Sequence, residues 1–454
     1  MAAFLTAFIN LAAQNTADIK IITLHSVVLN EDRIINIYSP PGAKDGGGNI
    51  KYPVLFLFDA ESLFQPLVGA VNFMQYSSSL PQLPECYIVG ITNTKRERDM
   101  PVPQNFQSTN GAKQFYTFLS TELLPFVKKH YQTSGLNVLI GHSQGGLFVT
   151  YAALRNTDLF PFVVALDAPI DVDSSLQKDL EQKMTGKCTL RYFSAETIFG
   201  WSKDFPADNS CMNFTKLKIT GETHETMPYK GMYEGLKFLF KEHVPMKKDL
   251  SLTELQLYYQ DLATKYGCVY NIPSAVLLNS ASQKIGSSHK KDALALLNYH
   301  EKLYGHQLRA ATLSEKASAI TKDPDSRIDH YLKSSSPGEE AIKPFLGKWK
   351  GTVFVPGGND MSVYYEIKKL NGKYTMTSRI NDAFNSSADF LLVQDNQELH
   401  FGRIHNGGGI YLSIGKLSSD GTSLTGTEDL IGFDFPKDFP PFKMNRFEFK
   451  KLGE

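Results

Sequence analysis

The chain has 454 residues, of which 42% are hydrophobic and 21% charged, proportions that fit a folded globular protein and exclude wholesale disorder. Its 47 Lys and Arg residues equal its 47 Asp and Glu residues, so the formal net charge is 47 − 47 = 0, which argues against a general nucleic-acid binder. The four cysteines form no CxxC pair, so neither a structural zinc site nor a dense disulfide framework is expected. This length predicts roughly two to four domains.

The N-terminal residues 1–18 form a possible signal segment. Residues 2–13 are apolar apart from Thr6 and Asn10, a stretch too short to cross a bilayer, which needs about 20 residues. It has the length of the hydrophobic region of a signal peptide, although no Lys or Arg precedes it. We therefore expect an exported protein (periplasmic, cell-surface or secreted), with an ordinary N-terminal helix of a cytoplasmic protein as the alternative. No later segment reads as a transmembrane helix.

Residues 19–246 alternate short apolar runs with amphipathic stretches. An opening hairpin precedes runs such as VLFLFD (54–59), NVLIGHS (137–143) and FVVALDA (162–168), and helical patterns lie between them. Short apolar runs of this kind are typical of buried parallel strands. The alternation predicts an α/β domain with a doubly wound, mostly parallel sheet.

The most informative motif in this region is GHSQG, residues 141–145. An apolar strand pattern precedes it and an apolar helix pattern follows it, which is the strand–turn–helix setting that a nucleophilic serine requires. Gly141 and Gly145 would clear space around the strained turn at Ser143. The backbone N–H of Gln144 would then point at a developing oxyanion. The motif predicts Ser143 as a nucleophile.

A serine hydroxyl needs a base, and His224 is the best candidate. In this motif's usual setting the chain order is serine, acid, histidine. His224 follows the last apolar run and precedes an amphipathic helix, as that order requires. His130 precedes the serine and His243 ends a helix, while His142 sits inside the motif, a usual place for a non-catalytic residue.

The acid of such a triad is ambiguous in this sequence. Glu196 ends the strand-like run before the last one and is the preferred candidate, with Asp204 and Asp208 following in the same loop. Asp171 or Asp173, or a Ser–His dyad without a conventional acid, remain alternatives. The acid orients the imidazole and stabilises its cation, so weaker substitutes can serve.

Two further loops complete the predicted site. The loop after VLFLFD offers the backbone N–H of Ala60 or Glu61 as the second oxyanion donor. The loop after the next strand, KRERD, carries Arg96, Arg98 and Asp99. Its arginines either bind an anionic substrate or, in the interpretation we favour, pair with neighbouring acids.

Residues 247–333 lose the strand signal and read as amphipathic helices that resemble degenerate tetratricopeptide-type pairs. Ser251 and Glu254 form a capping-box pattern at the start of this predicted connector. A Ser/Pro/Gly/Glu-rich linker covers 334–344. Residues 345–454 then alternate apolar and polar positions between turn signals, which predicts about eight antiparallel strands in a small barrel or sandwich.

The opening of this β-rich region, Gly347-Lys-Trp349, resembles that of lipocalin-like barrels. We expect a non-catalytic role, such as contact with a carbohydrate or other ligand or packing over the mouth of the active site. Tyr364, Tyr365 and Tyr411 would stack on sugars if exposed, although alternating aromatic residues in strands more often belong to a core.

Taken together, VLFLFDAES, the KRERD loop, GHSQGGLF and GETHETMPYKGMYEGLKFLF resemble the family of α/β hydrolases that includes esterase D and the enterochelin esterases. The resemblance runs from about residue 20 to 245. It implies carboxylic ester hydrolysis by Ser143 and His224, without a metal or organic cofactor, on a small-molecule or carbohydrate ester. The family spans siderophores, acylated sugars and glutathione thioesters, so no single substrate follows. An acyltransferase with the same residues, or an inactive binding or scaffold protein, are the alternatives.

Overall fold

The structure is a computed structural model. It describes residues 18–43, 50–77, 80–101, 110–185, 190–200, 213–246, 250–320, 331, 337–370, 372–381, 384–394, 397–404, 410–431 and 444–452. The predicted signal segment lies outside these residues except for Asp18. The chain forms two compact units, Met1–Pro245 with Gln256–Ala275, and Met246–Leu255 with Val276–Glu454.

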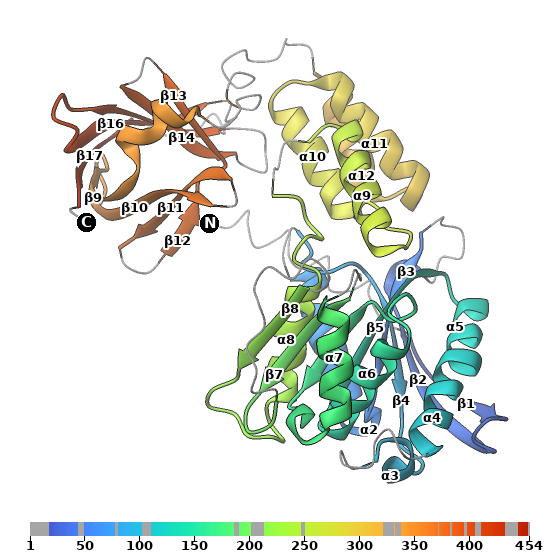
Figure 1. Ribbon diagram of the computed structural model, residues 1–454. Helices are drawn as coiled ribbons and strands as arrows, with labels where there is room; N and C mark the ends of the chain where they lie inside the picture. The colour runs from blue at the N-terminus through green and yellow to red at the C-terminus, as the bar shows by residue number, and fades with distance from the viewer. Residues whose placement is uncertain are drawn as a thin grey trace. The chain divides into compact units, whose positions relative to one another are not determined.

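The first unit is built on a twisted sheet (Figure 1). In the described part of the chain eight strands pair in the order β1-β2-β4-β3-β5-β6-β7-β8. The β1–β2 hairpin forms one edge, β2 pairs antiparallel with β4, and all further neighbours pair in parallel. The strands are Asp18–Ser26 (β1), Glu31–Ser39 (β2), Tyr52–Leu57 (β3), Tyr87–Ile91 (β4), Thr133–His142 (β5), Phe162–Leu166 (β6), Arg191–Glu196 (β7) and Asn213–Lys218 (β8).

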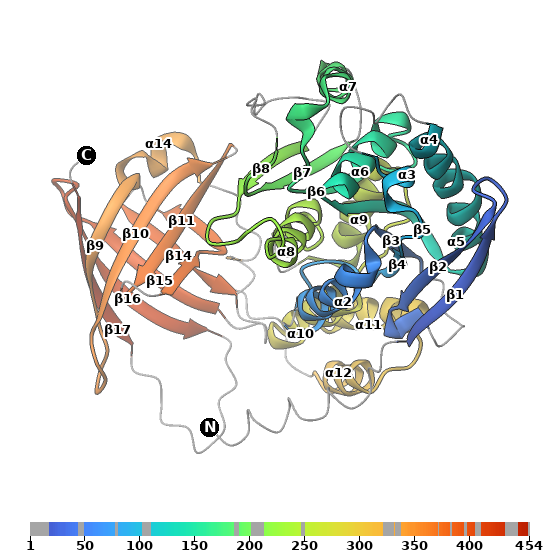
Figure 2. The ribbon, with the colours of Figure 1, turned by 90° about the horizontal axis from the view of Figure 1, so that it is seen from below.

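Helices cover both faces of this sheet. Figure 2 shows α2 and α8 on one face and α4, α5, α6 and α7 on the other. Strands β3, β4 and β6 are buried along their whole length, because both of their faces meet helices. This arrangement confirms the predicted doubly wound sheet. The helical segments of the unit are Pro41–Ala43 (η1), Ala60–Tyr76 (α2), Arg96–Asp99 (α3), Asn110–Thr117 (α4), the π-helical Phe118–Leu123 (η3), Leu124–His130 (α5), Gln144–Arg155 (α6), Ile170–Val172 (η4), Ser174–Thr185 (α7) and Pro228–Leu239 (α8).

Most of helix α9 (Leu252–Tyr266) also belongs to the first unit. Its Tyr258 and Tyr259 hydroxyls donate to the carbonyl oxygens of Glu242 and His243, at 2.6 and 2.7 Å. The buried Arg191 guanidinium lies 4.9 Å from the centre of the Tyr266 ring. These contacts fasten the start of the predicted helical connector to the α/β unit.

The second unit holds the remaining helices. They are Ser274–Gly286 (α10), Lys290–Tyr304 (α11), Leu308–Ser318 (α12), Glu339–Ile342 (α14) and Lys343–Phe345 (η5). The predicted capping box is present before α9, where the Ser251 N–H donates to the Glu254 carboxylate at 2.8 Å and the Glu254 N–H donates to the Ser251 hydroxyl at 3.3 Å. Among the described residues, none of the helices combines the length and apolarity needed to cross a membrane.

The β-rich region is an antiparallel, nearly closed barrel. Its sheet, in the described residues, has the order β12-β11-β10-β9-β17-β16-β15-β14-β13, so the first and last strands of the region pair with each other. The strands are Gly347–Phe354 (β9), Met361–Leu370 (β10), Lys373–Ile380 (β11), Phe384–Ser387 (β12), Phe390–Gln394 (β13), Glu398–Ile404 (β14), Ile410–Leu417 (β15), Ser423–Ile431 (β16) and Asn445–Lys451 (β17).

Aromatic and aliphatic side chains fill this barrel. Trp349 is buried in that core, and its indole N–H donates to the Phe345 carbonyl at 2.9 Å. Tyr365 packs edge-on against Phe401 and Phe449. The Tyr411 hydroxyl donates to the buried Glu428 carboxylate at 2.6 Å. Tyr365 is therefore an interior residue, whereas Tyr364 and Tyr411 are half-buried.

Candidate active site

The turn at Ser143 joins β5 to α6 in a strained conformation. Ser143 has φ 56° and ψ −121°, a backbone that residues with a side chain rarely adopt. Its N–H donates to the Leu166 carbonyl at 2.8 Å, and its carbonyl accepts the Leu147 N–H at 3.2 Å. The neighbouring strand and the helix thus hold the turn from both sides, which is the geometry of a nucleophile elbow.

Glycines make room for this turn at close range. A Cβ atom on Gly141 would lie 2.2 Å from the carbonyl oxygen of Gly145, and one on Gly146 would lie 2.7 Å from the Cβ atom of Ala168. Both distances are too short for a real Cβ contact, so a side chain at either position would force the turn to shift. At Gly145 a Cβ would approach the Asp59 carboxylate to 3.1 Å, a tight contact.

His224 and Asp167 form a hydrogen-bonded pair beside the elbow. The Nδ1 atom of His224 lies 2.8 Å from Oδ2 of Asp167, and the Asp167 side chain is fully buried. The His224 ring centre lies 4.4 Å from that of His142, the residue before Ser143. The Phe199 and His224 rings pack nearly perpendicular to each other, with 5.3 Å between centres. With Nδ1 bound to the carboxylate, Nε2 is the nitrogen left for proton transfer.

The Asp167 carboxylate is held by several donors. Oδ1 accepts the backbone N–H groups of Thr197 and Phe199, at 2.6 and 3.2 Å, and Oδ2 also accepts the Thr197 hydroxyl. Burial by itself raises the pKa of Asp167, but the hydrogen bonds from Thr197 and His224 outweigh it and leave the pKa below the usual value. Asp167 is therefore ionised at neutral pH.

His142 is the uncharged neighbour of this pair. Burial, followed by repulsion from His224, lowers the pKa of His142. Its Nε2 atom is buried and has no hydrogen-bond partner in the described structure. A second positive charge next to the His224 imidazolium is therefore disfavoured.

The structure places Asp167, rather than the expected Glu196, against His224. Glu196 ends β7, and its carboxylate accepts the Ser194 hydroxyl at 2.9 Å. Asp167 directly follows β6, which lies between β5 and β7 in the sheet. The end of β6 is thus one strand closer to the serine-bearing strand, and the loop after β7 folds back to donate to Asp167.

The other acidic candidates have different places. The Asp173 carboxylate caps α7 by accepting the Ser175 and Leu176 N–H groups, at 3.1 and 2.9 Å. The Asp171 N–H donates to the Gly200 carbonyl at 3.3 Å. Asp204 and Asp208 lie outside the described residues. Sequence reasoning overlooked Asp167, although a polar residue directly after the wholly apolar FVVAL strand was a usable signal.

Residues 26–213 match the family model described as "Putative esterase". This stretch is an esterase-family domain. It contains Ser143 and Asp167 and ends before His224. A search of curated proteins found the ferri-bacillibactin esterase BesA of Bacillus subtilis, 28% identical over 157 residues, which cover 30% of this chain and 54% of BesA. The chain thus spans about half the length of this relative.

The fold of the esterase domain also has a solved counterpart. An IroE-like serine hydrolase from Shewanella oneidensis superposes with a TM-score of 0.50 at 24% sequence identity, over 66% of this chain and 99% of that one. The likeness shows an α/β-hydrolase fold.

The predicted oxyanion donors lie at two helix starts of the esterase domain. Gln144 is the first residue of α6, and Ala60 and Glu61 are the first two of α2. Helix starts leave such N–H groups without intrahelical partners. Strands β3 and β5 pair in parallel, and the Phe58 N–H donates to the Ile140 carbonyl at 3.1 Å. The two helices therefore begin at the same edge of adjacent strands.

Arg96 contacts the residues around both helix starts. Its Nε and Nη2 atoms donate to the two carboxylate oxygens of Asp59, at 2.7 and 3.1 Å, and its Nη1 donates to the side-chain oxygen of Gln144. Asn93 donates to Asp59 at 2.7 Å and also contacts the Glu61 carboxylate. Hydrogen bonding to Asp59 raises the pKa of Arg96. Arg96 therefore belongs to the site.

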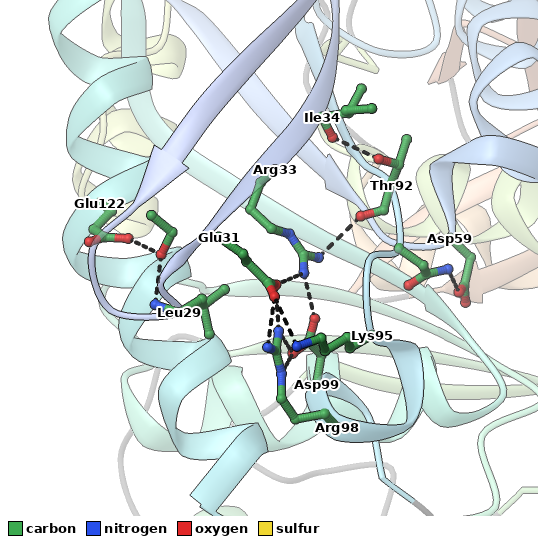
Figure 3. A network of polar contacts seen from close by, with 12 residues as sticks. Leu29, Glu31, Arg33, Ile34, Asp59, Thr92, Lys95, Arg98, Asp99 and Glu122 are labelled. Carbon is green, nitrogen blue, oxygen red and sulfur yellow. Dashed lines mark hydrogen bonds and ion pairs between the residues drawn. The ribbon is translucent and has the colours of Figure 1, made fainter.

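Arg98 and Asp99, by contrast, serve the scaffold. Figure 3 shows them facing Glu31 and Arg33 of β2. Arg98 donates twice to the Glu31 carboxylate, at 2.9 and 2.6 Å, and once to Asp99, at 2.7 Å. Arg33 and Asp99 have fully buried side chains 2.6 Å apart. This network agrees with the structural interpretation for Arg98 and Asp99, since their charged groups pair with each other and with β2.

Proposed function

We propose that this protein hydrolyses carboxylic esters through an acyl-enzyme, with Ser143, His224 and Asp167 as a catalytic triad. The observation that carries the proposal is the 2.8 Å contact between His224 and Asp167 beside the strained Ser143 turn, inside an esterase-family domain. The inactive scaffold alternative would gain if no carboxylate reached His224 or if His224 pointed away from Ser143, and the Asp167 contact argues against the first of these.

The residues divide the reaction as follows. Ser143 attacks the ester carbonyl while His224 takes its proton and then returns it to the leaving alkoxide. Asp167 orients the imidazole and stabilises its cation. The N–H of Gln144, together with that of Ala60 or Glu61, holds the oxyanion. Water activated by His224 then releases the acid and restores Ser143.

A siderophore-type ester is the substrate class that the comparisons favour. The relative BesA bears the name ferri-bacillibactin esterase. An acylated sugar is the competing class. Turnover of a panel of short acyl, feruloyl and catechol-siderophore esters would rank the two, and the siderophore proposal fails if only sugar esters are cleaved.

Replacement of the nucleophile tests the mechanism. In Ser143→Ala we expect hydrolysis of p-nitrophenyl acetate and butyrate to fall to near the uncatalysed rate, because the acyl acceptor is gone. Ser120→Ala is the matched control, because its hydroxyl donates to the carbonyl of Tyr116, four residues earlier in the adjoining helix α4, at 2.8 Å. A fluorophosphonate probe should label the wild type and the control but not Ser143→Ala. Undiminished turnover in Ser143→Ala would refute the mechanism.

Acyl transfer would use the same three residues with an alcohol in place of water. Added alcohols or sugars that divert product from the free acid to a new ester would favour transfer over hydrolysis.

Export is a separate proposal, motivated by residues 1–18, and fractionation of cells that produce the full chain tests it. For the barrel we propose a non-catalytic role, which a glycan-binding assay on the full chain would narrow.

A further inference from the structure

Asp59 stands at the start of helix α2 but does not cap it. An Asp at this position normally accepts a hydrogen bond from an N–H in the first helical turn. Asp59 makes no such side-chain bond, and its backbone is left-handed at φ 54°. Its carboxylate instead accepts hydrogen bonds from Arg96 and Asn93. The first N–H groups of α2, which include the proposed oxyanion donors, are thereby left without this anionic acceptor.

Arg96 also reaches the other half of the oxyanion site. One guanidinium binds both carboxylate oxygens of Asp59 and the side-chain oxygen of Gln144. Bidentate pairs of this kind fix the relative position of both groups. The pair is mostly withdrawn from solvent, with 34% of the Arg96 side chain and 11% of the Asp59 side chain exposed. A single side chain thus ties the start of α2 to the start of α6.

We propose that Arg96 is a positioning residue for the oxyanion site, an inference that rests on the proposed esterase function. It holds the Asp59 carboxylate away from the N–H groups of Ala60 and Glu61 and fixes the two helix starts relative to each other. Without Arg96, Asp59 turns toward the start of α2, competes for those N–H groups and places a negative charge beside the developing oxyanion.

This arrangement predicts an unusual pattern of rescue. Arg96→Met should lower kcat by about 10- to 100-fold with little change in KM, less than the loss of a whole oxyanion donor. Adding Asp59→Gly to Arg96→Met should raise kcat again by about tenfold, because the competing carboxylate is gone. Glycine also tolerates the left-handed backbone at this position. The kcat of Arg96→Lys should lie between that of the wild type and that of Arg96→Met. A purely structural ion pair predicts that removing the unpaired carboxylate raises the melting temperature of Arg96→Met without restoring its kcat.

Two esters separate positioning from substrate binding. Neutral p-nitrophenyl acetate and anionic mono-p-nitrophenyl succinate should lose kcat equally in Arg96→Met. A rise in KM confined to the succinate would instead make Arg96 an anion-binding residue and overturn the proposal. Lys95→Gln is the charge-matched control from the same loop, since its ammonium lies 3.9 Å from Glu31 and should leave both esters unaffected. Circular dichroism melting checks that each variant folds.

The outcomes also distinguish this inference from the proposed function. If the wild type is active and Arg96→Met keeps its kcat, or if Asp59→Gly rescues nothing, the positioning role is wrong and the esterase proposal stands. If the folded wild type hydrolyses neither ester and resists the fluorophosphonate probe, the esterase proposal is wrong and this inference falls with it.

Discussion

Two buried acidic sites in the first unit resemble each other in construction and differ in what they can do. At the end of β6, Asp167 accepts hydrogen bonds from Thr197, Phe199 and His224. At the β2–α3 corner, Glu31 and Asp99 accept hydrogen bonds from Arg33 and Arg98 (Figure 3). Each carboxylate accepts several hydrogen bonds and is largely buried.

The difference between the two sites lies in their basic partner. A guanidinium does not give up its proton in proteins, so the positive charges of the β2–α3 corner are permanent and this network cannot pass a proton. An imidazole titrates near neutral pH and can pass a proton. In the proposed mechanism, the same type of buried carboxylate therefore supports proton transfer at one site and only stability at the other.

Asp167→Asn should give the largest effect on activity. An amide in place of the carboxylate favours the wrong imidazole tautomer and cannot stabilise the imidazolium, so we expect kcat to fall by about 10³- to 10⁴-fold. Steady-state hydrolysis of p-nitrophenyl butyrate measures the loss, and melting curves confirm folding.

Glu196→Gln is the matched control for this variant. It also replaces a carboxylate at the end of a neighbouring strand, and Glu196 meets Ser194 rather than His224. We expect its kcat to stay within about twofold of the wild type, because the substitution leaves the Asp167–His224 pair in place. If Glu196→Gln loses as much activity as Asp167→Asn, the assignment of Asp167 as the acid is wrong.

The parts of the site that depend on local chain order were predictable from the sequence. The turn at Ser143 is signalled by the glycines of GHSQG between an apolar strand pattern and an apolar helix pattern. His224 is signalled by its place between the last strand run and an amphipathic helix. The doubly wound sheet and the barrel follow from apolar runs and alternation, so these predictions needed no long-range information.

The carboxylate beside His224 was harder to predict: the place of Asp167 after an apolar strand was a usable signal, but the choice among several acidic residues depends on which strand end reaches the histidine. Nothing in the local sequence of Asp167 announces that Thr197 and Phe199 will fold back from the end of β7 to bind it. Arg96 poses the same problem: its neighbour Arg98 is equally charged, and only the tertiary structure sends one side chain to Asp59 and the other to Glu31.

Glu31→Gln should affect stability rather than activity. Hydrogen bonding to Arg98 is the main cause that lowers the pKa of Glu31 to about 2, from an ordinary value of 4.5. That difference corresponds to about 3 kcal/mol of folding free energy at neutral pH. Because the folded-state pKa is depressed, the contribution is complete above pH 4.5 and is lost as pH falls toward 2.

Urea unfolding of the wild type and Glu31→Gln between pH 7 and pH 2 measures this contribution. The two unfolding free energies should converge at the acidic end, while kcat at pH 7 stays near the wild-type value. A gap in stability that is independent of pH would mean that lost packing, not the lost charge, destabilises the variant. A large loss of kcat in the folded protein would break the distinction between the two acidic sites.

Thr197→Val should have the smallest effect, and it tests how far the supporting bonds of Asp167 matter. The Thr197 hydroxyl binds Oδ2, the carboxylate oxygen that also meets His224, while the backbone N–H of Thr197 remains in the variant. Removing one hydrogen bond to a charged group typically costs about 1.5 to 3 kcal/mol in full, and relaxation around the remaining donors reduces the loss. We therefore expect kcat to fall about tenfold.

Thr121→Val serves as the control for Thr197→Val, because the Thr121 hydroxyl donates to the carbonyl of Thr117, four residues earlier at the end of α4, at 2.7 Å. The same loss of a hydroxyl there should leave kcat unchanged. Removing the Thr197 hydroxyl should also move the pKa of Asp167 upward, because one of the bonds that lower it is gone. If the kcat of Thr197→Val instead equals that of the wild type at every pH while Asp167→Asn is inactive, the two backbone donors alone suffice to hold the carboxylate. The Thr197 hydroxyl bond would then not be required by the proposed triad.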